Sequence, residues 1–200
     1  AFQNCTALTD ITIPSNVTSI GNYAFQNCTA LTDITIPSNV TGIGQYAFDG
    51  CTGLTSVTIK NGAIGKYAFQ GCTSLTSVTM ETAAEGGVTT GVTSISGNAF
   101  RNCTSLTSVN IPNTVTTIEG LAFGGCNALT SITIAEGNAT YKAVDNCIIE
   151  KASNTLVVGC STSIIPTDGS VTSIASYAFN SCTTLTAITI PDSVTSIGNY

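Results

Sequence analysis

The chain has 200 residues, 42% of them apolar and only 8% charged, and eleven acidic residues against five basic ones give a net charge of −6. This composition excludes a disordered chain, and the few scattered basic residues argue against nucleic acid or an anionic membrane surface as a partner. No apolar run approaches the roughly 18 residues needed to span a bilayer, so membrane insertion is not expected.

A phrase of 23 residues recurs along nearly the whole chain. Residues 8–30 contain Leu-Thr-Asp-Ile-Thr-Ile-Pro and later Tyr-Ala-Phe-Gln-Asn-Cys, and residues 31–53 repeat the pattern. A unit this short cannot bury its own apolar face, so copies must stack on one another as coils of a β-rich solenoid. We predict a single domain over 1–200, a piece of a longer array, with repeats that begin near residues 8, 31, 54, 75, 106, 129 and 185.

Each coil has the same predicted elements in the same order. In the first coil, residues 8–13 follow the spacing Leu-x-x-Ile-x-Ile and predict a short strand, because β-branched residues favour strands. Pro14 ends this strand, and residues 17–20 form a second extended segment. Residues 23–25 predict a short 3₁₀ or α turn. Strands of successive coils should pair in parallel, so that each inward position becomes a ladder of like side chains.

Two segments interrupt the repeat. Extra residues fall within 81–91, and a longer insertion occupies 135–170. Insertions are expected in loops, because the stacked positions of a solenoid do not accept them. Within the longer one, residues 147–150 and 155–158 are strand-like and joined by a polar turn. This pattern predicts a β-hairpin at about 147–158.

The 23-residue phrase resembles the BspA-type, or Treponema pallidum-type, leucine-rich repeat, with the consensus L-x-x-I-x-I-P-x-x-V-x-x-I-G-x-x-A-F-x-x-C-x-x. Residues 8–30, 31–53 and 106–128 match nearly every defined position, although Glu119 stands where Gly is expected. The resemblance implies a leucine-rich-repeat solenoid, a right-handed horseshoe with parallel strands on its concave side, short turns on the other side and an inserted hairpin. It also implies a surface or secreted protein with a tendency toward adhesion and no shared catalytic motif.

The nine cysteines fall into two sets. Seven hold one repeat position and are expected to be buried free thiols, because their side chains run parallel: Cys5, Cys28, Cys51, Cys72, Cys103, Cys126 and Cys182. Cys147 and Cys160 flank the hairpin and face each other if its turn centres near 153–154. They are a candidate disulfide worth about 2–3 kcal/mol, which would fit an oxidising location. The alternative is a pair of free thiols.

The outward side chains of the strands are the first candidate ligand contacts, because the concave face of a leucine-rich-repeat horseshoe is its usual binding face. The segments 81–91 and 141–160, the latter including the hairpin, are the second candidate and are favoured over the uniform strands, because departures from a repeat lie on loops, and loops often carry function. The strands carry no aromatic or Arg anchor in these positions, so a solvated Thr/Ser surface without a ligand is the alternative. The candidates are Asp10, Thr12, Asp33, Thr35, Ser56, Thr58, Tyr141, Lys142, Glu150 and Lys151.

The sequence offers little for catalysis. It contains no His, which excludes Ser–His and Cys–His nucleophile pairs within this chain, and it has no C-x-x-C metal motif and no phosphate-binding Gly-rich loop. We therefore expect no enzyme, no cofactor and no metal. Two hypotheses remain: an extracellular or cell-surface module that binds protein or glycan on host or microbial surfaces, and a passive spacer within a larger surface protein.

Overall fold

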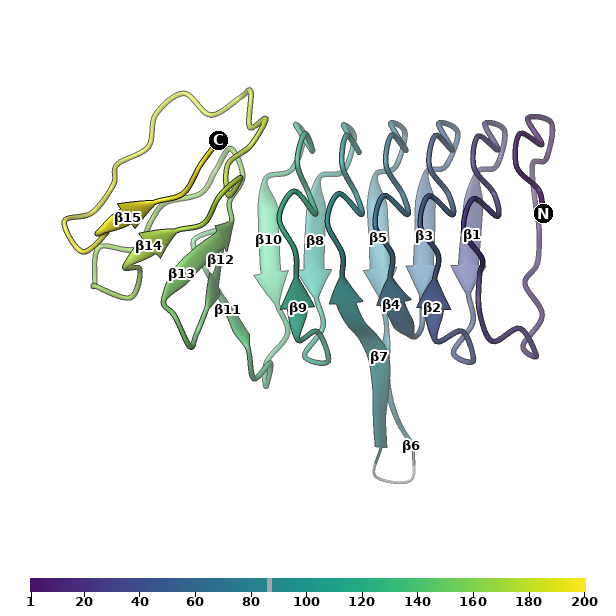
Figure 1. Ribbon diagram of the computed structural model, residues 1–200, viewed down its shortest axis with the longest axis horizontal. Coiled ribbons are helices and arrows are strands. Elements are labelled where there is room, and N and C mark those ends of the chain that lie inside the picture. Colours follow the sequence, from purple (N-terminus) through teal and green to yellow (C-terminus); the bar gives the residue numbers. More distant parts are fainter. Residues whose placement is uncertain (86–87) are drawn as a thin grey trace.

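The computed structural model describes residues 1–85 and 88–200, and within them the chain is a solenoid of short strands without a helix (Figure 1). One row of parallel strands follows the Leu-x-x-Ile-x-Ile segments. A second row follows the Val-x-x-Ile segments. The first row comprises β1 (Asp33–Ile36), β3 (Ser56–Ile59), β5 (Ser77–Met80), β8 (Ser108–Ile111) and β10 (Ser131–Ile134), and the second β2 (Gly42–Ile43), β4 (Gly62–Ile64), β7 (Val88–Ile95) and β9 (Thr117–Ile118).

Equivalent positions of successive coils lie in register, as the repeat predicts. Asp33 pairs with Ser56, and Ser56 pairs with Ser77, so β1, β3 and β5 form one parallel sheet. Strands β8 and β10 form another, which does not continue the ladder from β5. The break coincides with the first insertion, which lengthens the connection between these two coils.

The core consists of ladders of identical side chains. The rings of Phe25 and Phe48 stack with centroids 5.0 Å apart, and those of Phe100 and Phe123 are 5.5 Å apart. Inward strand positions such as Ile34 and the middle phenylalanines are fully or almost fully buried. Burial of each such side chain contributes roughly 1.5–3 kcal/mol, so stability accumulates coil by coil.

The expected 3₁₀ or α turns at positions such as 23–25 are a run of single turns instead. The N–H of Phe25 donates to the carbonyl of Ala47 in the next coil at 2.7 Å, whereas the N–H of Cys28 donates within its own coil to Phe25 at 3.2 Å. Tyr23 and Asn27 have left-handed φ angles of 57° and 58°. Because alternate N–H groups point to the neighbouring coil, consecutive bonds within one coil cannot accumulate into a helix.

The two end coils lack their predicted strands. Residues 8–13 and 185–190 form no ladder, and an isolated bridge between Ile20 and Ile43 joins the first coil to the second. Both segments lack the backbone hydrogen bonds to a neighbouring coil that make β1 a strand with a single partner, β3. The prediction of a strand at these two ends is therefore wrong.

The segment 81–91, expected as a loop, is largely a β-hairpin. Strand β6 (Thr82–Glu85) pairs antiparallel with the first half of β7, with Thr82 opposite Gly91, and residues 86–87 lie outside the described part. The hairpin projects from the second row of strands (Figure 1).

The second insertion contains the predicted hairpin and one more strand. Strands β11 (Tyr141–Val144), β12 (Cys147–Glu150) and β13 (Thr155–Val158) are consecutive antiparallel neighbours, and β14 (Ser173–Ile174) and β15 (Ser196–Ile197) follow in parallel. This sheet turns away from the main array (Figure 1). It has a small core of its own around Ile149, Leu156 and Ile174.

Candidate binding face

The outward side of β1, β3, β5, β8 and β10, here called the strand face, is a rigid polar platform. Along each strand the inward residues are buried, except for the half-buried Ile134 of β10, and the alternate residues point out. Of the predicted contacts, Asp33 and Thr35 are exposed, and Ser56 and Thr58 are half-buried. Because the strands are in register, these small polar side chains form straight rows across the coils.

Four of the predicted contacts meet in one groove. Asp10, Thr12, Asp33 and Thr35 line a hollow of about 240 Å³ between the first coil and β1. The groove exists because the segment 8–13 does not pair with β1 as a strand. The two aspartates give this end of the strand face a negative character.

A second threonine column beside the strand face is structural. The hydroxyl of Thr55 donates to the carbonyl of Thr32 at 3.0 Å, and that of Thr76 donates to the carbonyl of Thr55 at 3.1 Å. Each hydroxyl thus adds a bond between coils beside the backbone ladder. This accounts for Thr at the repeat position without any ligand.

Tyr141 is not available for a ligand. Its side chain is only 5% exposed, and its hydroxyl accepts the backbone N–H of Ile118 in β9 at 3.0 Å. The prediction of a ligand contact at Tyr141 is therefore wrong. The sequence gives no sign of this burial, because Tyr141 lies in the insertion, outside the repeat, on a strand that packs against the array.

The other three hairpin candidates keep some access to solvent. Lys151 is exposed and its Nζ donates to the carbonyl of Asn138, whereas Glu150 is half-buried and accepts a bond from the Ser153 hydroxyl. Lys142 is half-buried on β11. Local bonds thus orient Lys151 and Glu150.

Side chains of the second insertion end the strand rows. The amide oxygen of Asn146 accepts the N–H of Ile132 in β10 at 3.1 Å, and the hydroxyl of Thr162 donates to the carbonyl of Thr130. Together with the Tyr141 hydroxyl, these groups satisfy backbone atoms that another coil would otherwise pair. Buried backbone groups left unpaired would be costly, so the insertion serves as an internal cap.

Cys147 and Cys160 do not face each other directly as predicted. Ile148 pairs with Val158 across a register shift, so Cys147 falls one residue out of step with Cys160. Both are buried free thiols in this structure, and burial raises the pKa of Cys147 to about 11. Their disulfide stays a prediction.

The cysteine ladder donates hydrogen bonds between coils. The thiol of Cys51 lies 3.1 Å from the carbonyl oxygen of Phe25, and that of Cys72 lies 3.2 Å from that of Phe48. Burial raises the pKa of Cys51 to about 12. The expected burial holds for the five middle cysteines of the ladder, but Cys5 in the first coil is exposed and Cys182 in the last is half-buried.

Ile164 is a surface feature that the sequence reasoning missed. It is 67% exposed, and it lines a groove of about 400 Å³ with Thr167 and Ile188. In the first coils the equivalent position, between the isoleucines of Ile-Thr-Ile-Pro, is Thr. The sequence Ser-Ile-Ile-Pro at 163–166 could have predicted this exposed residue, because it places an apolar side chain at an outward position.

Aromatic side chains gather away from the strand face. The rings of Tyr23 and Tyr46 stack at 5.2 Å, those of Tyr46 and Tyr67 at 4.6 Å, and Lys66 Nζ lies 5.2 Å from the Tyr67 ring centre. Stacking covers the ring faces within the column, which leaves mainly edges for other contacts.

The described residues contain no group of three or more His, Cys, Asp or Glu side chains able to hold a metal ion. Nor does any helix in that part of the chain have the length and apolar character to cross a membrane.

The stacked parallel strands, the in-register ladders and the polar strand face define the chain as a leucine-rich-repeat solenoid. The model of the BspA type leucine rich repeat region matches six copies, over residues 1–86, 87–148 and 150–200, and the chain belongs to this family. No functionally curated protein matches it.

Solved bacterial proteins share the fold. A leucine rich cell surface protein from Faecalibacterium prausnitzii A2-165 is 35% identical, with a TM-score of 0.66 over 96% of this chain and 57% of its own. Pneumococcal vaccine antigen PcpA is 24% identical, with a TM-score of 0.77 over 94% and 46%, and this likeness shows the fold alone. The T. pallidum leucine rich repeat protein is 25% identical, with a TM-score of 0.57 over 94% and 72%. The chain spans about half the length of the first two proteins.

Proposed function

We propose that the chain is a non-enzymatic binding module that attaches to protein on host or microbial surfaces through its strand face. The observation that carries the proposal is that rows of outward side chains lie on two in-register sheets, β1–β3–β5 and β8–β10, which stand on a continuous apolar core. Such a platform is preorganised, so little side-chain or loop ordering opposes binding.

The chemistry of the strand face favours a broad, shallow contact. Its outward groups are short hydroxyl, amide and carboxylate side chains, among them Thr35, Asn110 and Thr133. Short polar groups give many weak hydrogen bonds and no deep pocket, as in polar protein–protein interfaces. The aspartates at 10 and 33 and the net charge of −6 favour a neutral or basic partner surface.

An extracellular or cell-surface location is part of the proposal. The relative from Faecalibacterium prausnitzii, at 35% identity, is described as a cell surface protein, and the family match covers almost the whole chain.

The test is binding of the chain to immobilised matrix proteins, mucins and glycans at physiological salt, with an unrelated acidic protein as control. The proposal expects saturable binding to at least one protein surface. Binding to glycan alone would overturn the assignment to protein. A clean negative across the panel would contradict the binding module and favour the passive spacer.

A further inference from the structure

A groove of about 390 Å³, here called the junction groove, lies where β10 of the strand face meets the turn between β11 and β12. It is lined by three residues of β10 and three of the hairpin beside it: Ile132, Thr133, Ile134, Ala143, Asp145 and Asn146. Coils precede and follow these residues along the chain, so the groove is internal to the array. Its volume falls within the range of about 300–1,000 Å³ that is typical of ligand sites.

The walls of the junction groove are partly apolar because the array changes direction here. Ile134 is half-buried, whereas its equivalents Ile36 and Ile111 are fully buried. Strand β10 has β8 as its ladder partner, and the sheet of the second insertion turns away from it (Figure 1). One side of Ile134 therefore stays open to solvent, next to the half-buried Ala143 of β11.

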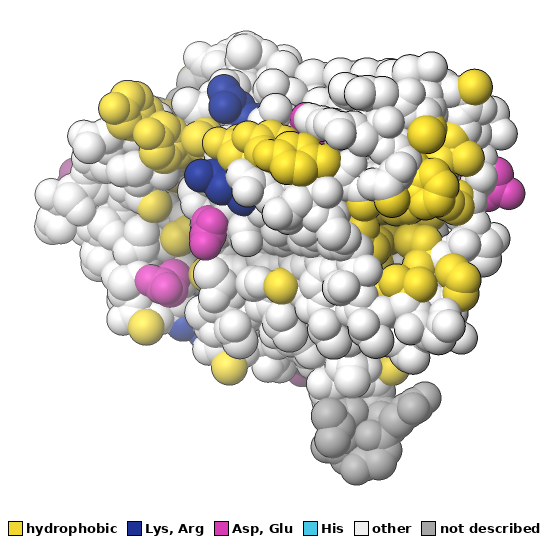
Figure 2. Space-filling model, turned by 45° about the vertical axis from the view of Figure 1, so that its right-hand side comes forward, with side chains coloured by type: hydrophobic (Ala, Val, Ile, Leu, Met, Phe, Trp, Pro, Cys, Tyr) yellow, Lys and Arg dark blue, Asp and Glu magenta, His cyan; other side chains and the backbone are white. Residues whose placement is uncertain are grey.

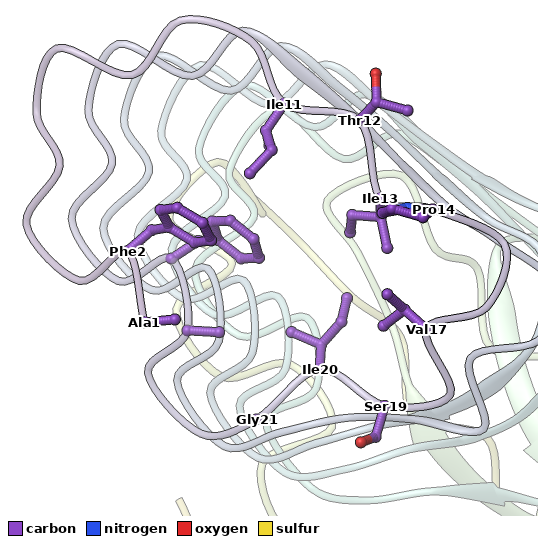
Figure 3. Close-up of a pocket in the computed structure, with 12 residues that line it drawn as sticks. Ala1, Phe2, Ile11, Thr12, Ile13, Pro14, Val17, Ser19, Ile20 and Gly21 are labelled. Carbon is purple, nitrogen blue, oxygen red and sulfur yellow. The ribbon is translucent and has the colours of Figure 1, made fainter.

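An exposed isoleucine extends this apolar surface beside the groove. In the first coil Ile11 and Ile13 point inward, and Thr12 between them points away from the core (Figure 3). Ile164 occupies the position of Thr12 in the repeated phrase and is 67% exposed. The N–H of Ile164 donates to the carbonyl of Asp145 at 3.1 Å, so this outward apolar residue adjoins the groove.

The turn that carries Asp145 is held in place from two sides. Asp145 and Asn146 have φ angles of 47° and 62°, as in a two-residue type I′ hairpin turn. The Asn146 amide oxygen accepts the N–H of Ile132 at 3.1 Å, and its amide nitrogen donates to the hydroxyl of Thr162 at 3.1 Å. The Asn146 carbonyl accepts the hydroxyl of Ser163 at 2.7 Å. Asp145 is therefore preorganised, and little ordering opposes the binding of a ligand there.

Asp145 gives the junction groove a negative charge that the chain itself does not neutralise. It is exposed, and the one ion pair among the described residues joins Lys60 to Glu81. Lys142, the nearest basic residue along the chain, is adjacent to Ala143 on β11, and successive side chains of a strand point to opposite faces. Figure 2 shows few charged side chains on the face that it presents, so a carboxylate beside an apolar wall is a distinctive feature of this surface.

We propose that the junction groove takes an arginine side chain of the partner protein. The methylene stem packs on Ile134 and Ala143, and the guanidinium pairs with the carboxylate of Asp145. A guanidinium is planar, binds a carboxylate through two parallel hydrogen bonds and is weakly hydrated, so it suits a site that is partly apolar and partly charged. The outward positions of the strand face carry no aromatic or Arg side chain, so an anchor of this kind has to come from the partner. This inference rests on the proposed binding function and specifies the chemistry of the partner.

The test is an NMR titration of the ¹⁵N-labelled chain with the capped tripeptide acetyl-Val-Arg-Val-amide. The control peptide has citrulline in place of arginine, which keeps the shape of the side chain and removes its charge. The backbone amide signals of Ile134, Asp145 and Ile164 should shift saturably with the arginine peptide. The citrulline peptide should bind at least about threefold more weakly, as expected for the loss of one partly exposed ion pair.

Asp145→Asn should weaken binding of the arginine peptide to the same extent, and the turn should survive because Asn tolerates a left-handed φ angle. Glu136→Gln, at an exposed position that follows β10, removes the same charge and should bind like the native chain. Equal binding of the two peptides, or undiminished binding by Asp145→Asn, would overturn the proposal. So would the absence of saturable shifts at the groove. Binding of the chain to a panel protein in that last case would leave the strand face as the binding surface and remove only the arginine site.

Discussion

The phenolic oxygen of Tyr141 accepts the backbone N–H of Ile118 at 3.0 Å, and this bond joins the inserted meander to the last strand of the second row. The amide oxygen of Asn146 accepts the N–H of Ile132 in the first row at 3.1 Å. The insertion therefore closes both rows with side-chain groups. It lets the chain begin a second sheet in a new direction without leaving these two donors unpaired.

Tyr141→Phe should lower the free energy of unfolding by about 1–3 kcal/mol, because the ring remains but the buried Ile118 N–H loses its acceptor. Urea denaturation followed by circular dichroism measures the change. Tyr23→Phe is the matched control, since Tyr23 is 41% exposed, and it should change the stability by less than about 0.5 kcal/mol. Equal effects of the two substitutions would contradict the capping role.

Asn138→Ala should be more damaging than Tyr141→Phe. The buried Asn138 amide donates to the carbonyls of Pro112 and Val115, and its oxygen accepts the N–H of Tyr141. Its loss unpairs several groups at once, and we expect at least about 3 kcal/mol of destabilisation. Thermal unfolding against the exposed control Asn16→Ala checks this, and indistinguishable midpoints would disprove it.

A thiol-specific reagent should react faster with the cysteine of the first coil than with the cysteines of the internal coils. Cys5 is exposed, whereas Cys72 and Cys103 are buried and burial raises the pKa of both thiols well above the ordinary value. Under native conditions at pH 8, a thiol-specific reagent should modify Cys5 first, because the reactive species is the thiolate. Peptide mass spectrometry identifies the labelled site. Labelling of Cys72 as fast as Cys5 would show that the core opens readily.

The free energy of unfolding should fall in alkaline solution. Unfolded thiols titrate near their ordinary pKa of 9.0, whereas burial raises that of Cys51 to about 12 and that of Cys182 to about 11. Between these values the folded chain retains protons that the unfolded chain has lost, so stability present below pH 9 is lost as the pH rises toward 12. For one thiol that is protonated in the folded chain and ionised in the unfolded chain, the free energy of unfolding falls by about 1.4 kcal/mol per pH unit.

Denaturation at pH 7 to 11 measures this slope. Cys51→Ala supplies the control, because removal of one buried thiol should make the alkaline decline shallower. The same slope in both proteins would contradict the assignment to Cys51.

The repeat predicted the internal coils well, because the same inward-facing side chains recur at the same positions in every coil. Ile34 and its equivalents are inward and buried, and Phe25 stacks on Phe48, as the period implies. The turn after Tyr23 was predicted less well, because its conformation depends on hydrogen bonds to the next coil rather than on local propensity. The strands expected at 8–13 and 185–190 were predicted wrongly, because their backbone groups do not form the hydrogen bonds to a neighbouring coil that define a strand.

The candidate site was predicted in part. Asp10 and Asp33 do meet at one groove, because their identical repeat positions stack. Tyr141 was misplaced, because the insertion lies outside the repeat and no period predicts which of its side chains turn inward. Ile164 was overlooked because it replaces Thr within an otherwise regular phrase.

Lysine substitutions test most directly whether the strand face binds the partner protein. The direct measurement is the Kd of the triple variant Thr35→Lys, Thr58→Lys and Thr79→Lys for the panel protein that the native chain binds best. A matched triple variant on the exposed positions Thr18→Lys, Thr41→Lys and Thr116→Lys, outside the strand face, adds the same charge.

The strand-face triple variant should raise the Kd at least about tenfold, or about 1.4 kcal/mol, while the matched variant should stay within about threefold of the native chain. Both proteins must retain the native circular dichroism spectrum. Equal Kd values for the two variants would contradict the strand face as the binding surface.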